Sequence, residues 1–210
     1  MERGPQDGST GLIEIIAGGM FSGKSEELVR RLRRAVIGRQ KVQVFKPVAD
    51  TRHAPERLVT RDNRELSATS VVDSNQLVRE LYPDTQVVGV DEAQFFDQGL
   101  IQQATAMADR GVRVIIAGLD QDFSRQPFGP MPGLLSIAEY VDKMHAVCVS
   151  CGRPAHYSHR ISGGSAQVLV GDVELYEARC RRCYLGPLSE GRAIGSRLHE
   201  APDHVGQSRT

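Results

Sequence analysis

The sequence lacks net charge, long apolar runs and any cysteine before residue 148. Its 26 lysines and arginines balance 26 aspartates and glutamates, so overall charge gives no support for binding nucleic acid or an anionic membrane. No apolar run approaches the ~20 residues of a membrane span. The first eleven residues are polar and glycine-rich, unlike a signal peptide. These absences predict a cytoplasmic protein without membrane or nucleic-acid partners.

A phosphate-binding motif lies close to the start of the chain. Residues 12–16 are apolar and predict a buried strand, and apolar residues recur at helical spacing after Ser25. Between them, residues 18–25 fit the pattern G-x-x-x-x-G-K-[ST]. In such a loop, backbone N–H groups and Lys24 bind phosphates, and the Ser25 hydroxyl can ligate Mg²⁺. A glycine-rich turn before a helix is the plainer alternative, but the complete motif favours nucleotide binding.

Strands and helices alternate along most of the chain. Apolar runs predict four strands, and helical periodicity predicts three helices between them. The strands cover 12–16, 42–45, 87–90 and 112–117, and the helices cover 26–38, 74–81 and 98–110. This order predicts an α/β fold, a P-loop NTPase-like parallel sheet flanked by helices. Because ligands bind at the carboxyl ends of such strands, residues 18–25, 91–92 and 118–120 should meet in one cleft.

Two acidic residues follow the third predicted strand. Asp91 comes directly after residues 87–90, as in a Walker B motif, whose aspartate supports the Mg²⁺ held by the P-loop hydroxyl. Glu92 points to a different side of the strand end, where it could take a proton from a nucleophile. Two acids that merely end a strand in solvent would give the same pattern. Their position downstream of a P-loop favours catalysis.

All four cysteines lie in the last third of the chain. They form two Cys-x-x-Cys pairs separated by 28 residues: Cys148, Cys151, Cys180 and Cys183. Two such pairs can supply four thiolates to one tetrahedral ion, which predicts a closed structural zinc site. Two disulfides, which a reducing compartment disfavours, and a redox pair are the alternatives. His156 and His159 lie between the pairs and are competing candidate ligands.

A series of motifs gives the chain a specific resemblance. The P-loop is followed by Asp50-Thr51-Arg52, residues 91–96, 118–120, Phe123, 127–129 and the two cysteine pairs with Tyr176 between them. Over about residues 11–188 the sequence resembles the type II thymidine kinases, the zinc-containing cellular type. The resemblance implies transfer of the γ-phosphate of ATP to the 5′-hydroxyl of thymidine. The product would be dTMP, a precursor for DNA synthesis.

The resemblance implies roles for residues around the phosphates. Glu92 would be the general base on the 5′-hydroxyl, while Ser25 and Asp91 would serve Mg²⁺. Arg52 would stabilise charge on the transferring phosphate, with Asp50 supporting that region. The residues implied in ATP and phosphate binding are Gly18, Gly19, Met20, Phe21, Ser22, Gly23, Lys24, Ser25, Arg52, Asp91 and Gln94.

The nucleoside pocket implied by the resemblance is apolar, which suits a flat pyrimidine and its methyl group. Each aromatic residue taken alone would be interpreted as ordinary core. The segment between the cysteine pairs resembles a lasso loop that closes over the nucleoside and binds its base edge mostly through backbone groups. The matching residues are Met20, Phe95, Leu119, Phe123 and Phe128 in the pocket, and Ser158, Leu169 and Tyr176 in the lasso.

Composition and pattern, together with the resemblance, predict an organisation for the whole chain. A disordered leader at 1–10 would precede a P-loop kinase core at 11–145, a zinc-binding and lasso domain at 146–190 and a disordered tail at 191–210. The family implies a homotetramer that uses ATP and thymidine and is inhibited by dTTP. Acceptance of deoxyuridine is left open.

Three positions depart from the family pattern. Gly19 stands where a proline is frequent, Arg61 where a histidine is common, and Asp172 where the lasso has its second glycine. The change at Asp172 matters most, because a glycine at positive φ has more backbone freedom than an aspartate. None of the three removes a phosphate or metal ligand.

Two other functions share parts of this pattern. Residues 91–94 also resemble the Walker B motif of nucleic-acid-dependent ATPases, and the basic run at 30–41 could contact phosphates. A nucleic-acid-dependent ATPase that moves along its substrate usually needs two such P-loop domains, and this chain has room for only one. The preceding Glu26 and Glu27, with zero net charge, favour a solvated helix face. A P-loop switch that binds nucleotide without phosphorylating a metabolite is the third interpretation.

Overall fold

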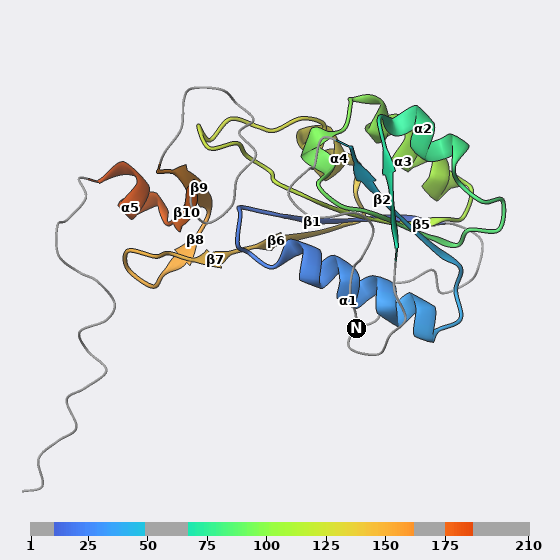
Figure 1. The fold of residues 1–210 in the computed structure, drawn as a ribbon, viewed down its shortest axis with the longest axis horizontal. Helices are drawn as coiled ribbons and strands as arrows, with labels where there is room; N and C mark the ends of the chain where they lie inside the picture. Colours follow the sequence, from blue (N-terminus) through green and yellow to red (C-terminus); the bar gives the residue numbers. More distant parts are fainter. Residues whose placement is uncertain (1–10, 49–66, 162–174, 187–210) are drawn as a thin grey trace, which may run out of the picture.

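A six-stranded parallel sheet forms the centre of the molecule (Figure 1). The computed structural model describes residues 11–48, 67–161 and 175–186. The strand order is β3-β2-β4-β5-β1-β6, and every neighbouring pair is parallel. The strands are β1 (Leu12–Gly18), β2 (Val42–Pro47), β3 (Ala68–Val71), β4 (Val87–Val90), β5 (Arg113–Gly118) and β6 (Tyr140–Met144). The predicted α/β fold is confirmed.

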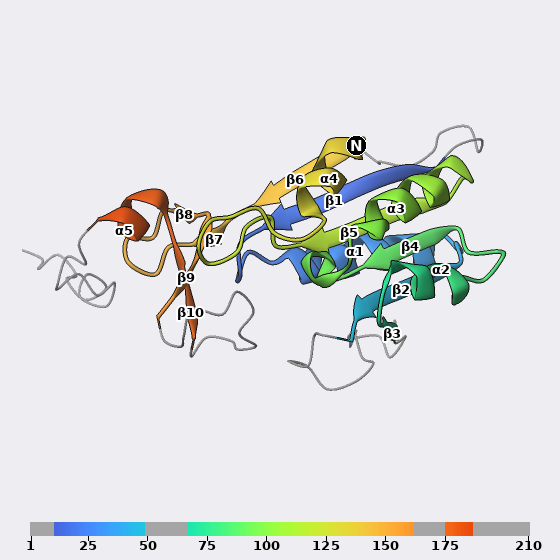
Figure 2. The same cartoon turned by 90° about the horizontal axis from the view of Figure 1, so that it is seen from above.

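Helices cover both faces of the sheet. Helix α1 (Lys24–Ile37) packs Leu28 and Leu32 against one face, where they meet Ile16 of β1. Helices α2 (Ser74–Arg79), α3 (Gly99–Asp109) and α4 (Met131–Ile137) cover the opposite face, toward which Ile13 and Ile15 point. Because side chains alternate along a strand, β1 serves both cores and is buried on both sides. Figure 1 shows the resulting three layers, and Figure 2 shows the strands of the sheet side by side.

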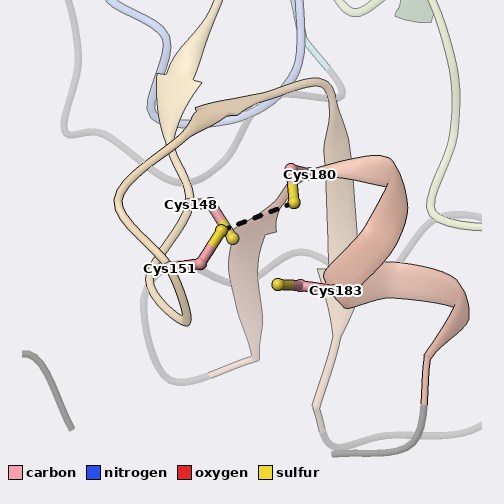
Figure 3. Close-up of side chains that lie close together, drawn as sticks. All are labelled: Cys148, Cys151, Cys180 and Cys183. Carbon is pink, nitrogen blue, oxygen red and sulfur yellow. Dashed lines mark hydrogen bonds between the residues drawn. The ribbon is translucent and has the colours of Figure 1, made fainter. Parts of the chain in front are cut away.

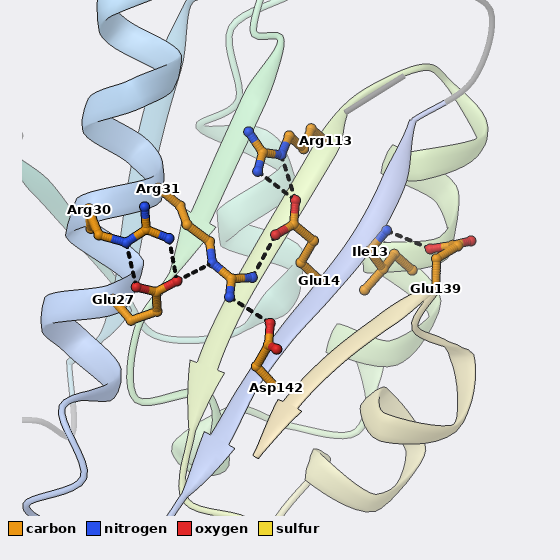
Figure 4. A network of polar contacts seen from close by, with 8 residues as sticks. All are labelled: Ile13, Glu14, Glu27, Arg30, Arg31, Arg113, Glu139 and Asp142. Atoms are coloured by element: carbon orange, nitrogen blue, oxygen red, sulfur yellow. Dashed lines mark hydrogen bonds and ion pairs between the residues drawn. The ribbon is translucent and has the colours of Figure 1, made fainter. Parts of the chain in front are cut away.

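A buried ion-pair network fixes α1 to the sheet (Figure 4). Glu14 of β1 is fully buried, and its carboxylate binds Arg31 of α1 and Arg113 of β5, each at 2.6 Å. Arg31 also binds Asp142 of β6 at 2.6 Å and Glu27 at 2.8 Å. A buried charge is tolerated when it is paired and hydrogen-bonded, as both partners are here. The network therefore fixes how α1 lies across three strands.

A small unit follows β6, beyond the carboxyl ends of the parallel strands (Figure 2). It contains two two-stranded antiparallel sheets and one short helix. Its elements are β7 (Ala146–Val147), β8 (Pro154–Ala155), β9 (Tyr157–Arg160), β10 (Tyr176–Arg179) and α5 (Arg181–Leu185). Across the described part of the chain, no helix combines the length and apolar character that crossing a membrane requires.

Candidate functional site

The P-loop connects β1 to α1, as its sequence predicts. Gly23 caps the helix at φ 81°, a left-handed conformation that costs glycine little. The Lys24 ammonium and the Ser22 hydroxyl both donate to the Gly19 carbonyl, at 2.8 Å. The first N–H groups of a helix have no partner within it, and the helix dipole adds partial positive charge there. The loop therefore has the electrostatics of a phosphate site.

Asp91 lies beside the P-loop. Its Oδ1 accepts hydrogen bonds from the Ser25 hydroxyl at 3.3 Å and from the Glu92 N–H at 2.9 Å. Burial, followed by the negative charge of Glu92, raises the pKa of Asp91 to about 6. A hydroxyl and a carboxylate in contact form the oxygen donor set that suits Mg²⁺. The two residues predicted to serve this ion are thus side by side.

Glu92 has an uncommon backbone conformation. Its φ of 52° and ψ of 40° are left-handed, a region that few residues other than glycine adopt. The short helix η1 (Ala93–Phe95) begins directly after it. The Glu92 carboxylate accepts a hydrogen bond from the side-chain amide of Gln94. Strained backbone of this kind is frequent at functional sites, which agrees with the predicted catalytic role without testing it.

Several residues predicted to bind the nucleoside lie at the same edge of the sheet. The rings of Phe95 and Phe128 meet edge to face, with centroids 5.6 Å apart. Leu119 directly follows β5 and is 8% exposed, as is Phe128. The Met20 N–H donates to the Ser158 hydroxyl at 2.9 Å, which joins the P-loop to β9. Residues far apart in sequence are thus brought together around the strand ends.

Phe123 and Tyr176 are connected by a residue that the sequence analysis did not identify. The guanidinium of Arg160 lies 3.7 Å from the centre of the Phe123 ring and donates to the Tyr176 hydroxyl at 2.6 Å. The Tyr184 hydroxyl donates to the Phe123 carbonyl at 2.8 Å. An arginine in a polar segment carries no motif, so no sequence signal pointed to it.

Six residues discussed from the sequence lie outside the described residues. They are Asp50, Thr51, Arg52, Arg61, Leu169 and Asp172. The roles implied for Arg52 and Leu169 stay predictions, as does the importance of Asp172.

The four cysteines converge on one point (Figure 3). Their sulfur atoms all lie within 4.8 Å of one another, and those of Cys151 and Cys180 are 3.6 Å apart. Four sulfurs at a Zn–S distance of ~2.3 Å would be separated by about 3.8 Å. All four cysteines are free thiols, so the alternative of two disulfides is not found. The cluster fits a tetrahedral zinc ion.

The surroundings favour ionisation of Cys148, whereas the hydrogen bond with Cys151 raises the pKa of Cys183 to about 12. Burial opposes ionisation of Cys148, but backbone groups of Cys180 and Ser150 and the Cys151 thiol outweigh it and lower the Cys148 pKa to about 6. The thiolate is the form that binds metal. The two competing candidate ligands are engaged elsewhere, because His156 packs on the His145 ring at 4.3 Å and His159 on the Tyr184 ring at 5.3 Å.

Comparisons with known proteins agree with this geometry. A family model described as thymidine kinase matches residues 11–184. The thymidine kinase of Porphyromonas gingivalis strain W83 is 55% identical over 174 residues, 83% of this chain and 85% of the relative. That of Bacteroides fragilis strain YCH46 is 50% identical over 182 residues, covering 87% and 91%. That of Bdellovibrio bacteriovorus strain HD100 is 52% identical over 172 residues, covering 82% and 84%.

Proposed function

The chain belongs to the thymidine kinase family, whose members phosphorylate thymidine to dTMP, and from this premise we propose how its residues divide the reaction. The contact between Ser25 and Asp91, at 3.3 Å, supports the proposal most directly. It joins the phosphate-binding loop to the acidic pair and brings Glu92 to the same strand edge. A phosphoryl donor and a proton acceptor can therefore face one substrate.

The P-loop binds the triphosphate of ATP. Backbone N–H groups of residues 18–25 and the Lys24 ammonium contact the phosphate oxygens, and Arg52 joins them. Gln94, which the resemblance placed in the same set, has its side chain hydrogen-bonded to Glu92 and Leu119 instead. Ser25 and Asp91 would hold Mg²⁺, which suits their oxygen donors. When bound, this ion neutralises charge that develops on the phosphates. The protein's contribution is to position the donor and exclude other geometries.

Glu92 accepts the proton of the thymidine 5′-hydroxyl. As the hydroxyl oxygen forms its bond to the γ-phosphorus, the bond to the oxygen bridging the β- and γ-phosphates breaks and ADP leaves. The proton passes to the Glu92 carboxylate, which functions as the general base. The position of Glu92 beside Asp91 and the P-loop supports this role.

The thymine base occupies the apolar region at the strand ends. Phe95 and Phe128 supply aromatic surface for the pyrimidine and its methyl group, and Leu119 extends it. Ser158 and Tyr176 contribute from the lasso side, together with Leu169. The Met20–Ser158 hydrogen bond supports a pocket formed jointly by the core and the small unit.

Zinc would be held by the four clustered cysteines. Two of them lie on the β7–β8 turn and two at the start of α5, so the bound ion would crosslink these elements. Its chemistry here is structural, because four thiolates leave no ligand position open. The hairpin of β9 and β10, which carries Ser158 and Tyr176, lies between the two cysteine pairs in sequence.

Further properties follow from family membership and are part of the proposal. The chain assembles as a homotetramer, is cytoplasmic and is inhibited by dTTP. Deoxyuridine, which lacks only the methyl group of thymidine, is a candidate second substrate. Light scattering should give about four times the 23.0 kDa of one chain. A mass of one chain would contradict the tetramer.

Release of ADP in the presence of different acceptors tests the activity. The zinc-loaded protein is incubated with ATP and Mg²⁺ alone, with thymidine, or with single- and double-stranded DNA. We expect ADP release only with thymidine. Release that depends on DNA would instead support a nucleic-acid-dependent ATPase. Tight nucleotide binding without turnover under any condition would support a P-loop switch.

A further inference from the structure

Both polar atoms of the Gln94 side chain form hydrogen bonds within the protein. It is 2% exposed and belongs to η1, two residues after Glu92. Its Nε2 donates to Glu92 Oε2, and its Oε1 accepts the backbone N–H of Leu119 at 2.8 Å. The sequence pattern grouped Gln94 with the phosphate-binding residues. Its two contacts instead connect the candidate base to the first residue after β5.

The two contacts fix the orientation of the amide. A backbone N–H can only donate, so Leu119 requires the oxygen of the Gln94 side chain. The NH₂ group then necessarily points toward Glu92, where a carboxylate is a strong acceptor. No exchange of the nitrogen and oxygen positions would satisfy both neighbours. The direction of the Gln94–Glu92 bond is thus set by its partners.

The surroundings of Gln94 leave it little room to move. Gly129 lies over its backbone at φ 52°, and a Cβ at that position would be only 2.2 Å from the Gln94 carbonyl oxygen. At the amide end of the Gln94 side chain, a Cβ at Gly118 would be 3.1 Å from Gln94 Oε1. Both glycines allow close approach of the strand-end loops. Gln94 is therefore a rigid support for the groups that it contacts.

We propose that Gln94 is a positioning residue for phosphoryl transfer. It holds the Glu92 carboxylate toward the 5′-hydroxyl and, through Leu119, ties that orientation to the edge of the nucleoside pocket. The inference rests on the proposed role of Glu92 as the base. A carboxylate on a left-handed backbone needs such a support, because a base misplaced by about 1 Å loses much of its effect.

Substitution Gln94→Met tests the proposal, because it keeps the side-chain length and removes both hydrogen bonds. We expect kcat to fall about tenfold to a hundredfold, with KM for ATP and for thymidine changed less than twofold. In a Glu92→Gln background, Gln94→Met should cause no further loss. Gln98→Met, at an exposed position four residues away, is the matched control and should leave kcat unchanged.

A second variant keeps the test decisive if Gln94→Met does not fold. Gln94→Glu retains an acceptor for the Leu119 N–H but places a second carboxyl group against Glu92, so kcat near neutral pH should fall. Because two carboxyl groups in contact at this buried position also lower stability, thermal unfolding is measured beside kcat to confirm that the assayed protein is folded. A raised KM for ATP, or a loss of equal size in the Glu92→Gln background, would assign Gln94 to phosphate binding and overturn the proposal. If Glu92→Gln alone leaves kcat unchanged, the assignment of the base fails instead, independently of Gln94.

Discussion

Arg160 shows how a single residue can join the two parts of the site. Its guanidinium lies over the Phe123 ring of the core and hydrogen-bonds to the Tyr176 hydroxyl of the small unit. Two of these three residues were predicted to contact the nucleoside. An arginine over an aromatic face contributes roughly 0.5–1 kcal/mol at an exposed site. Arg160 therefore stabilises the contact between Phe123 and Tyr176, at the edge of the proposed nucleoside pocket.

Substitution Arg160→Met keeps much of the side-chain volume and removes the charge. We expect KM for thymidine to rise about two- to fivefold, the factor that corresponds to roughly 0.5–1 kcal/mol, while KM for ATP stays unchanged. Steady-state kinetics with each substrate varied in turn measures the two KM values separately. Arg153→Met, at an exposed position outside this contact, is the control. Equal effects on both KM values would contradict a local role at the pocket.

At the residue scale, the sequence predicted residue types better than their contacts. The spacing of the P-loop and of the cysteine pairs identified Ser25 and the four thiols, because their chemistry demands a fixed local pattern. Arg160 and the contacts of Gln94 could not be predicted in this way. Leu119 lies 25 residues from Gln94, and Phe123 is also distant in sequence from Arg160, so only the packed strand ends bring these partners close.

At the scale of elements, the cysteine cluster connects the β7–β8 turn to α5. The small apolar cluster beside it consists of Ala146, Ala155 and Ala178 with the cysteines, which is too little burial to order the unit alone. A bound metal would then supply most of the stability of this unit.

Metal analysis of purified protein should find about one zinc per chain. Cys151→Ser should lose the metal, lower the unfolding temperature and weaken thymidine binding more than ATP binding, because the P-loop lies on the core. Ser150→Ala, in the same turn, should keep zinc and both affinities. Protein that is free of zinc yet fully active would show that the cluster has no structural role.

The ion pairs of Glu27 on α1 predict in which direction the free energy of unfolding changes with pH. A hydrogen bond from Arg30, joined by Arg31 and opposed by burial, lowers the pKa of Glu27 from 4.5 to about 2. A lowered pKa in the folded state means that the unfolded chain binds the proton more readily. The stabilisation is thus present above about pH 4.5 and is lost as the pH falls toward 2.

Glu27→Gln should accordingly lower Tm by a few degrees above pH 5 and approach the wild-type Tm as the pH falls toward 2. Thermal unfolding at a series of pH values measures the difference in Tm between Glu27→Gln and the wild type. Protonation of the cysteine thiolates affects both proteins equally and so cancels in this difference. Glu26→Gln, at an exposed position beside it, is the control. A difference that is constant with pH would exclude Glu27 as the titrating group.

Element predictions succeeded where periodicity was strong. The strands at β1, β2, β4 and β5 and the helices α1, α2 and α3 were predicted within a few residues. Strand β6 was missed because it lies at the sheet edge with Tyr140 and Val141 exposed, so it carries no buried apolar run. Strand β3 was missed because it has only four residues, two of them exposed. Helix α4 has Pro132 and Gly133 directly after its first residue, and it has too few turns to show a period.

At the scale of the whole molecule, the core and the small unit meet at the loops that carry the candidate site. Ser158 of β9 accepts from the P-loop at Met20, and the Tyr184 hydroxyl of α5 donates to the Phe123 carbonyl of the core at 2.8 Å. Ligands bind at this edge in parallel sheets. In the proposed function, this arrangement would let the core hold the phosphate donor while the small unit contributes to the nucleoside pocket.

The most direct measurement follows the phosphate itself. Wild-type protein and Glu92→Gln are each given ATP labelled at the γ-phosphate together with thymidine. We expect the label in dTMP with the wild type, and a rate about 10²–10⁴-fold lower with Glu92→Gln at unchanged ATP affinity. Label that never reaches the nucleoside, or equal rates for the two proteins, would contradict the assignment of Glu92 as the base facing the 5′-hydroxyl.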